Sequence, residues 1–306
     1  MAQSPRAVMM VSPDHFRYNH ETAYSNAFQK DSLLCEGQHV HEKAITEFNN
    51  LVNLLRGHGI QVFVFPSPKG KETPDAVFPN NWVSFHEDGK VILYPMLTPN
   101  RRLERRIEII EELKKSFFVS DIIDLTAEEK NGRILEGTGS IVFDRQNMMA
   151  YANTSARTDK HLFYDVVESM GYEGIHFRAT DENGKDIYHT NVIMTIGDGY
   201  AVVCKEAIHH DDAGEIINTL KSGALEVVEI SFAQMNSFAG NMIELRNRSG
   251  EKFLLMSTQA FNSLSEEQKA TLSRFGQLIH ADISTIETIG GGSVRCMIAG
   301  IHLPRK

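Results

Sequence analysis

The amino-acid sequence is poor in cysteine. Its 306 residues include three cysteines, Cys35, Cys204 and Cys296, which lie far apart and form no CxxC pair. An odd, sparse set of this kind argues against a disulfide framework and against a zinc–thiolate site. We therefore expect a reducing, cytoplasmic environment in which Cys35 and Cys204 are packing residues.

Apolar runs long enough to span a membrane are also missing from the sequence. The N-terminal stretch MAQSPRAVMMVSPDHF carries an apolar segment that is too short for a secretory signal. Hydrophobic residues make up 42% of the chain and charged residues 23%, as in ordinary globular proteins. We expect a globular protein with no membrane partner.

Positive charge is in short supply as well. Lysine and arginine total 31 against 40 aspartate and glutamate residues, so the formal net charge is −9. Proteins that bind nucleic acid through phosphate contacts need a basic face, and this balance argues against that class. The densest basic stretch, NRRLERRIEIIEELKK, interleaves acids at helical spacing, which is typical of a solvated helix face.

Histidines cluster twice, in HVHEK and in IHHDD. Both clusters contain residue types that bind metals, but both lie in segments with the pattern of a helix or a helix start. We expect these histidines at the solvated surface and predict no metal site.

An internal repeat organises the chain. Five segments share a small or polar triplet followed by a strand, a turn and often a second strand; they read FPNNWVSFHEDGKVILYP, LEGTGSIVFDRQNMMAYA, YHTNVIMTIGDGYAVVC, FAGNMIELRNRSGEKFLLM and IGGGSVRCMIAG. Their alignment equates Asn81, Gly139, Asn191, Asn241 and Ser293. The period is about 50 to 60 residues, within the range expected of propeller-like arrays.

Helical patterns lie between most of these hairpins, over residues 38–58, 99–118, 155–171, 206–222 and 265–276. After each helix comes another strand: QVFVFP, FVSDIIDL, GIHFRA, LEVVEIS or LIHADIST. Strands that alternate with helices predict an α/β fold, and the repetition predicts units that close around an axis. We expect one domain over residues 1–306.

In such an arrangement the loops that begin the hairpins converge on one centre. They carry Asn80, Asn81, Glu136, His189 and Cys296. A cysteine nucleophile needs a proton carrier, and a carboxylate can orient the imidazole. Each residue alone has a structural alternative: a cysteine in the core, a histidine bonded to backbone, a carboxylate in a turn. The three residues lie at equivalent points of separate repeats. This shared position makes the three structural alternatives less convincing than they are for each residue alone.

Three consecutive glycines, at residues 290–292, precede Cys296. Residues 293–301 after them have the pattern of a buried strand. We predict that the glycines let the backbone bend so that this strand can enter a crowded centre.

At this point the sequence resembles the guanidino-group modifying superfamily: arginine deiminases, dimethylarginine dimethylaminohydrolases and amidinotransferases. The motifs that carry the resemblance are DAVFPNNWVSF, TPNRRLERR, LEGTGSIVF, SARTDKH, YHTNVIM and GGSVRCMI, in that order over nearly the whole chain. The resemblance implies a five-bladed α/β propeller with pseudo-fivefold symmetry. Within the superfamily, the sequence looks closest to bacterial hydrolases that use citrulline.

The resemblance also implies roles for individual residues. Cys296 matches the nucleophile, His189 the general acid/base and Glu136 its carboxylate partner. Asp75 matches an acidic residue that holds the substrate α-amino group. The implied partner is a small-molecule amino acid, and neither a metal nor an organic cofactor is expected. The oligomeric state stays open, a homodimer included.

Arg101 and Arg157 match arginines that position the substrate α-carboxylate, a use that suits a forked cation. Two other positions depart from the deiminases. Asn81 stands where they have a carboxylate, and Asn191 stands where their HxD motif has aspartate. A neutral amide suits a neutral ureido group better than a guanidinium, which is costly to bury without a charged partner. We therefore expect citrulline as substrate, with ornithine, ammonia and carbon dioxide as products.

Alternatives remain at this stage. Arginine deiminase, dimethylarginine dimethylaminohydrolase or amidinotransferase activity would use the same Cys–His–Glu set, and Glu136 could supply charge for a guanidinium. A non-catalytic amino-acid sensor has no need of a nucleophile. The polar stretch SPDHFRYNHETAYSNAF is interpreted either as a lid over the site or as an ordinary connecting loop.

Overall fold

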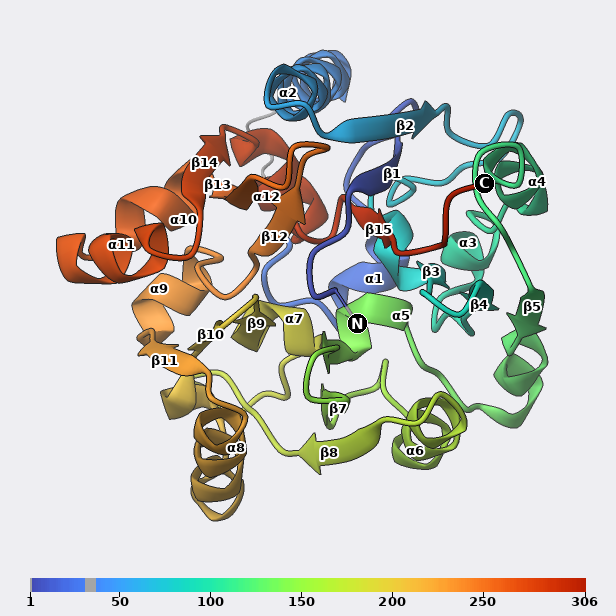
Figure 1. Ribbon diagram of the computed structural model, residues 1–306. Coiled ribbons are helices and arrows are strands. Elements are labelled where there is room, and N and C mark those ends of the chain that lie inside the picture. The colour runs from blue at the N-terminus through green and yellow to red at the C-terminus, as the bar shows by residue number, and fades with distance from the viewer. Residues whose placement is uncertain (1, 31–36) are drawn as a thin grey trace.

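The computed structural model describes residues 2–30 and 37–306, and it shows an α/β fold (Figure 1). The predicted α/β class is therefore confirmed. Cys35, predicted to be a packing residue, lies outside the described residues.

The strands of the described residues form one six-stranded sheet and three three-stranded sheets. The six-stranded sheet has the order β2 (Gln61–Phe65), β1 (Ala7–Val11), β15 (Ala299–Ile301), β3 (Val83–Phe85), β4 (Lys90–Leu93) and β5 (Asp121–Asp124). The smaller sheets contain β6 (Val142–Asp144), β7 (Met149–Asn153) and β8 (Glu173–Phe177); β9 (Met194–Ile196), β10 (Tyr200–Val203) and β11 (Glu226–Glu229); and β12 (Ile243–Arg246), β13 (Lys252–Ser257) and β14 (Gln277–Ala281).

One connection recurs in these sheets: an antiparallel hairpin, then helical structure, then a strand parallel to the second hairpin strand. In the first small sheet, β6 and β7 pair antiparallel, and β7 and β8 pair parallel. The other two small sheets repeat this pattern. The six-stranded sheet contains two more such sets, β3–β4–β5 and β15–β1–β2, joined where Ile301 pairs with Phe85. The predicted repeat is thus present, and its last set is built from both ends of the chain.

Helices lie outside the strands, and short helices lie nearer the centre (Figure 1). The α-helices are α1 (His20–Ala23), α2 (Gly37–Gly57), α3 (Pro99–Arg102), α4 (Ile107–Leu113), α5 (Gly137–Ser140), α6 (Lys160–Ser169), α7 (Thr190–Ile193), α8 (His210–Ser222), α9 (Phe232–Asn236), α10 (Thr258–Ser263), α11 (Glu266–Ser273) and α12 (Ser284–Gly290). The 3-10 helices are η1 (Pro79–Asn81), η2 (Thr126–Asn131) and η3 (Lys205–Ala207).

The helix predicted over residues 99–118 is two helices, α3 and α4, with a turn between them. The reason is that the two pieces bury different surfaces. Helix α3 buries the charged side chain of Arg101, whereas α4 buries Ile109, Ile110 and Leu113 against the sheet. The helix predicted over residues 38–58 is present as α2, and α6, α8 and α11 begin later than predicted; α11 begins with the capping box of Ser265.

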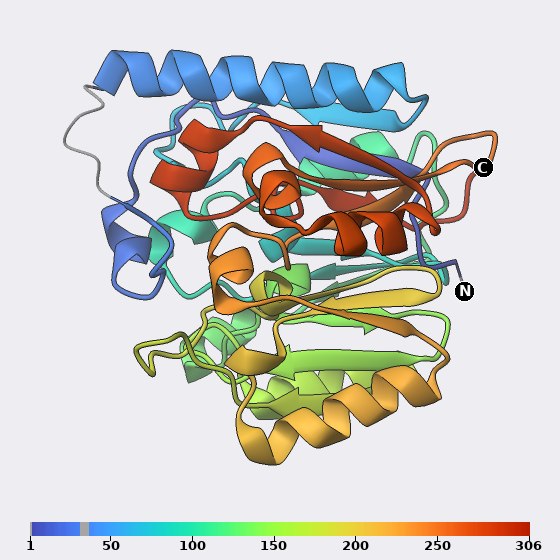
Figure 2. The same ribbon diagram turned by 90° about the vertical axis from the view of Figure 1, so that its left-hand side faces the viewer.

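Helix α2 illustrates how the outer helices are held. Its apolar side chains Val40, Ala44, Phe48, Leu51 and Leu55 recur every three or four residues and are buried. This spacing forms a single stripe, which packs in one core with strand residues. Burying each large side chain contributes about 1.5–3 kcal/mol to stability. Figure 2 shows α2 lying along one edge of the molecule.

The first strand of each hairpin starts close to the centre, directly after a loop or short helix. Element η1 precedes β3, α5 precedes β6, and α7 precedes β9. The N- and C-termini lie on one side of the molecule and α1 on the opposite side (Figure 2). Within the described ranges, no helix combines the length and apolar character needed to cross a membrane.

Candidate active site

Cys296 is buried where the loops that begin the hairpins meet, with 2% of its surface exposed. Its backbone amide donates to the Ser293 carbonyl at 2.9 Å, so the cysteine lies in a turn before β15. The strand predicted over residues 293–301 is therefore wrong in its first part. The turn satisfies the backbone amide locally, and only Ala299–Ile301 joins the sheet.

The side chains of two asparagines contact the sulfur. The Nδ2 atoms of Asn241 and Asn191 lie 3.4 Å and 3.6 Å from Cys296 Sγ. Asn241 is held in this orientation because its Nδ2 also donates to the Asn191 carbonyl and its Oδ1 accepts from the Arg295 amide. Hydrogen bonds to an ionised acceptor are stronger than those to a neutral one. The two amides can therefore help to stabilise a sulfur anion.

The glycine run before Cys296 follows a tight path. Gly291 ends α12 in the left-handed region, with φ of 64°. A Cβ on Gly290 or Gly292 would lie 2.8 Å or 3.0 Å from the ring of Phe78. The crowding that was predicted at the centre is present, and it is the Phe78 ring that would clash with a side chain.

His189 and Glu136 form a buried pair beside this turn. His189 Nε2 lies 2.9 Å from Glu136 Oε2, and each residue is 1% exposed. Burial lowers the pKa of His189 to about 4, although the carboxylate opposes the shift. Burial works against ionisation of Glu136 too, but the Arg157 guanidinium and the bond from His189 hold its pKa well below the usual range. At neutral pH the pair is therefore a neutral imidazole whose Nε2 proton is donated to a carboxylate, and within the described residues its Nδ1 makes no hydrogen bond.

The polar N-terminal segment, residues 12–28 (the lid loop), folds over the pocket. Asn19 Nδ2 donates to Asp75 Oδ2 at 2.7 Å, and Arg157 Nη2 donates to Ser25 Oγ at 2.8 Å. Asn26 Nδ2 donates to a carbonyl of the glycine run at 3.1 Å. Of the two interpretations of this segment, the contacts favour the lid, since it bonds to the groups that line the pocket.

Arg101 is buried beneath the pocket, and most of its N–H groups already donate to acceptors within the protein. Its Nε and Nη2 donate to the two carboxylate oxygens of Glu104 at 3.0 and 2.9 Å, and its Nη1 donates to Asn81 Oδ1 at 2.7 Å. Nη2 also donates to the Phe78 carbonyl. Burial raises the pKa of Glu104 to about 7 even with this cation beside it. Little of the guanidinium is left to hold a substrate carboxylate.

Other polar atoms around the pocket have no partner in the described parts of the chain. These buried atoms include Asp75 Oδ1, Asn81 Nδ2 and Arg157 Nε. Buried polar atoms are normally hydrogen-bonded. An unpaired acceptor, a neutral donor and a cationic donor in one place are what a bound amino acid would satisfy.

Two of the predicted binding residues face elsewhere. Asn80 donates its side-chain amide to Thr138 Oγ1 at 3.3 Å, which ties neighbouring loops together. Asn191 lies behind the sulfur, where its Nδ2 also contacts the Thr138 carbonyl. Glu136 is behind His189 and does not line the pocket itself. The pocket is lined by Asn26, Asp75, Phe78, Asn81, Arg101, Arg157, Tyr188, His189, Gly290, Gly291, Gly292 and Cys296.

The pocket is closed in this structure. Its free volume is ≈ 10 Å³, about the space of a single water probe. An amino acid can therefore enter only after the lid loop moves away.

Sequence reasoning missed three features of this site. Asn241 was aligned with Asn81 and Asn191 in the repeat, and that position was the signal for it. Glu104 lies three residues after Arg101, a spacing that places both side chains on one helix face. The contacts of Asn19 and Ser25 have no comparable signal in the sequence.

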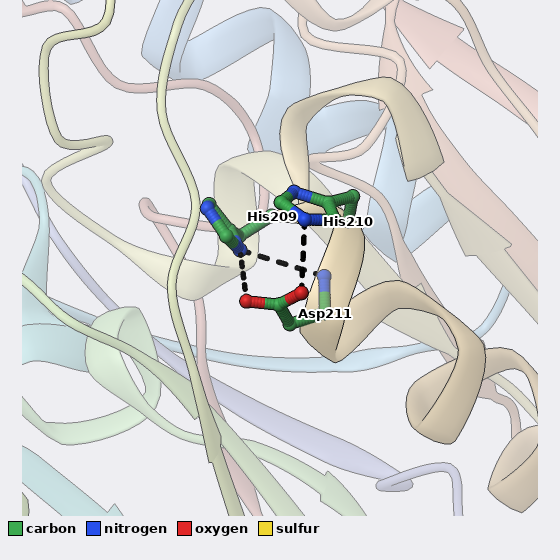
Figure 3. A group of neighbouring side chains, drawn as sticks. All are labelled: His209, His210 and Asp211. Atoms are coloured by element: carbon green, nitrogen blue, oxygen red, sulfur yellow. Dashed lines mark hydrogen bonds and ion pairs between the residues drawn. The ribbon is translucent and has the colours of Figure 1, made fainter.

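The two remaining cysteine and histidine predictions concern other regions. Cys204 is buried in a hydrophobic core, and burial raises the pKa of its thiol to about 11, as expected of a packing residue. His209, His210 and Asp211 lie at the start of α8, largely at the surface, with potential ligand atoms within 4.8 Å of one another (Figure 3). Arg178 Nη2 lies 3.2 Å from Asp211 Oδ2 and would compete with a metal ion. We interpret the cluster as a surface ion-pair network.

Comparisons with known proteins agree with this fold. The N-terminal domain of ArgZ, described as an arginine dihydrolase from the ornithine-ammonia cycle in cyanobacteria, matches with a TM-score of 0.76 and 16% identity, covering 97% of this chain and 98% of that chain. DDAH from Pseudomonas aeruginosa, solved as a cysteine-to-serine variant with citrulline, matches with a TM-score of 0.64 and 18% identity over 99% and 100% of the two chains. AgrE with L-arginine matches with a TM-score of 0.76 and 17% identity over 98% of this chain and 40% of that chain. At these identities the matches establish the fold.

A family model identifies the chain more specifically. No curated protein sequence matches it. The family model described as N,N dimethylarginine dimethylhydrolase, eukaryotic, matches residues 12–303, which is almost the whole chain and includes every residue of the pocket. The chain therefore belongs to the N,N-dimethylarginine dimethylhydrolase family, whose members are hydrolases that act on amidino C–N bonds.

Proposed function

We propose that this protein is a cysteine-dependent hydrolase of an arginine-related amino acid, and that it converts citrulline to ornithine, ammonia and carbon dioxide. The observation that carries the proposal is one buried pocket lined by Cys296 and by His189, whose Nε2 is hydrogen-bonded to Glu136 behind it. Membership of a family that cleaves amidino C–N bonds supports the reaction class.

In the proposed reaction, the thiol proton of Cys296 passes to Nδ1 of His189, and the sulfur attacks the ureido carbon to form a C–S bond. The C–N bond to the side chain breaks as His189 returns the proton to the departing amine, which leaves as ornithine. Water then attacks the S-carbamoyl carbon, His189 takes its proton and returns it to the sulfur, and the C–S bond breaks. The carbamate that is released decomposes to ammonia and carbon dioxide.

His189 is suited to this role because it is neutral at rest. A pKa of about 4 keeps the imidazole unprotonated at neutral pH, so it can receive the thiol proton, and the imidazolium then formed is stabilised by Glu136 at 2.9 Å. The amides of Asn191 and Asn241 hydrogen-bond the sulfur as charge develops on it.

The α-amino and α-carboxylate groups of the substrate are assigned to Asp75 and Arg157. Asp75 Oδ1 and Arg157 Nε are both buried and unpaired. The lid-loop side chains Asn19 and Ser25 occupy neighbouring atoms of the same two groups and must be displaced. Arg101 is proposed to hold Asn81 and Asp75 in place, because its own donors are taken by Glu104 and by backbone carbonyls.

The hydrogen bonds of Asn81 are the basis for proposing a neutral substrate over a cationic one. Its Oδ1 already accepts from Arg101, which leaves its Nδ2 as the buried, unpaired atom. A ureido oxygen can accept from this donor, whereas a guanidinium has only donors to offer. This favours citrulline over arginine.

Hydrolysis of arginine or a methylarginine by the same Cys–His–Glu set is the second candidate, and the family description favours it. Both ligand types occur on this fold, since the Pseudomonas DDAH structure holds citrulline and the AgrE structure holds L-arginine. An amidinotransferase would need an acceptor amine. A sensor is the weakest alternative, because it would have no use for the thiol.

The proposal extends to the architecture. The five strand sets would form a five-bladed propeller of one catalytic domain, residues 1–306, with a small-molecule amino acid as its partner.

The test is release of ornithine, citrulline, ammonia and methylamines from purified protein offered L-citrulline, L-arginine and methylated arginines in parallel. Cys296→Ser is the blank, and Cys204→Ala, which removes a buried thiol elsewhere, is the matched control. Turnover of citrulline alone, lost only with Cys296→Ser, supports the proposal in full. Turnover of arginine instead keeps the mechanism and refutes the argument from Asn81. Equal activity in Cys296→Ser would refute the nucleophile.

A further inference from the structure

A second polar cavity lies at the centre of the molecule, on the side away from the lid loop. It is lined by residues of the first strand of every hairpin, β3, β6, β9, β12 and β15, and by Gln3 and Pro5 near the N-terminus. Its volume is ≈ 70 Å³, against about 30 Å³ for a water molecule in the liquid. This space, here named the central cavity, has room for a small polyatomic ion.

Two arginines in its wall have few partners. Arg145 is 6% exposed, and among the described residues its side chain makes one hydrogen bond, a 3.5 Å contact from Nη1 to the Tyr172 hydroxyl. Arg295 donates from Nη1 to the Ile298 carbonyl at 3.0 Å. Throughout residues 2–30 and 37–306, no carboxylate oxygen lies within 4.0 Å of either guanidinium. Cations removed from water normally have an anion beside them.

The positive field extends beyond these two side chains. His302 also lines the central cavity, and burial lowers its pKa well below the ordinary value, with further lowering by Arg145, Arg295 and Arg246. Arg246 has a buried, unpaired Nε. Burial lowers the pKa of Arg295 itself to about 10, and the charge of Arg145 adds to this.

One carboxylate, Glu244, does line the central cavity, but it faces other donors. It accepts from the Ser4 hydroxyl and from the Asp198 amide. Burial raises the pKa of Glu244, and Lys252 is the cation that opposes this shift. Glu244 is therefore engaged by its own partners, and within the described residues neither guanidinium of the central cavity has a carboxylate beside it.

We propose that the central cavity is a binding site for a small inorganic oxyanion of the phosphate or sulfate class, held between the guanidinium groups of Arg145 and Arg295. Guanidinium groups bind such anions through paired N–H donors, and both have donors to spare. The site is separate from the pocket that holds Cys296, although the two are close. Asn191 lies in the wall of the central cavity and contacts the sulfur, and Arg295 precedes Cys296 in the chain.

The experiment titrates inorganic phosphate into the full-length protein in Hepes buffer at constant ionic strength and follows the thermal midpoint. A ligand that binds only the folded state raises the midpoint progressively with its concentration. Chloride and acetate are run as separate arms, to distinguish an oxyanion site from a general anion or carboxylate site. Arg145→Gln removes one cation of the site, and Arg248→Gln, at an exposed arginine, is the matched control.

The proposal expects the midpoint to rise with the logarithm of phosphate concentration in the wild-type protein and in Arg248→Gln, by more than in the chloride and acetate arms, and expects this rise to be lost in Arg145→Gln. A rise of equal size in Arg145→Gln would place the anion elsewhere and overturn the proposal, as would a phosphate effect no larger than that of chloride. Should Arg145→Gln fail to fold, a sulfate-soaked crystal of the wild-type protein decides. Density for sulfate between Arg145 and Arg295 supports the site, and a central cavity holding only water overturns it. None of these readouts depends on the reaction proposed above.

Discussion

The buried state of His189 makes a quantitative prediction about acid stability. Its pKa is lowered by burial from 6.5 to about 4 in the folded protein. Above pH 6.5 the imidazole is neutral in both the folded and the unfolded chain, so it adds nothing to the pH dependence. Below pH 6.5 the unfolded chain takes up a proton that the folded chain does not, and the free energy of unfolding falls.

The size of the effect follows from the interval between the two pKa values. At pH 5, which is 1.5 units below the unfolded value, the loss is about 2 kcal/mol at about 1.4 kcal/mol per unit. Glu136 does not interfere in this interval. Its folded pKa is held below its usual range, so its own stabilisation is lost only as the pH falls below about 4.5.

The assay compares urea unfolding of the wild-type protein and His189→Gln at pH 7.5 and pH 5. Glutamine removes the titration and keeps a donor for Glu136. His86, His176 and His302 also have lowered pKa values and give both proteins the same background slope. The wild-type protein should lose about 2 kcal/mol more than the variant on acidification. Equal losses in the two proteins would refute the neutral, buried His189 described above.

Three further predictions concern the surroundings of the thiol. Gly291→Val forces a branched residue to φ of 64° and drives its Cβ to 2.6 Å from Asn26 Nδ2 of the lid loop, so turnover should fall; Gly70→Val, at φ of 69° with open space around it, isolates the backbone strain, and equal activity in the two variants would contradict the contact. Glu104→Leu leaves the buried guanidinium of Arg101 without the two oxygens that accept from its Nε and Nη2, and should lower the free energy of unfolding by about 3 kcal/mol in urea, whereas a loss below about 1 kcal/mol would show the pair to be dispensable. Asn241→Leu removes an amide that lies 3.4 Å from the sulfur. One charge-assisted hydrogen bond is worth about 1.5 kcal/mol, so iodoacetamide alkylation of Cys296, followed by peptide mass, should slow about tenfold. An unchanged rate would show that the amide does not stabilise the sulfur anion.

The repeat was visible in the sequence because it combines two kinds of signal. Hydrophobic alternation locates the hairpins, and a small or polar residue marks where each begins. Asn81 and Asn241 lie two residues before β3 and β12, while Gly139 and Asn191 lie three before β6 and β9. Ser293 lies six residues before β15, and this longer offset holds the turn that contains Cys296. The pattern of apolar residues alone cannot separate a buried turn from a buried strand, which is why the strand was predicted too long.

The chemistry of the site was partly accessible from the sequence. The convergence of Glu136, His189 and Cys296 follows from their positions in the repeat. The engagement of the Arg101 N–H donors does not follow from the repeat, because it depends on which side chains are buried next to the guanidinium. Asn80 is a similar case: it stands beside Asn81 in the chain, yet the tight turn of η1 sends its amide to Thr138 and not to the pocket.

The strand set that contains β15 is completed by β1 and β2, so the segment that carries Cys296 pairs with the opposite end of the chain. During synthesis on the ribosome, the sulfur therefore emerges after both Glu136 and His189. A nascent chain that ends before residue 296 already contains His189 and Glu136 but has no thiol to work with them. A circular permutant that joins residue 306 to residue 1 and opens the β6–β7 turn would bring out the thiol before Glu136, although still after His189, while keeping every pairing in the sheets.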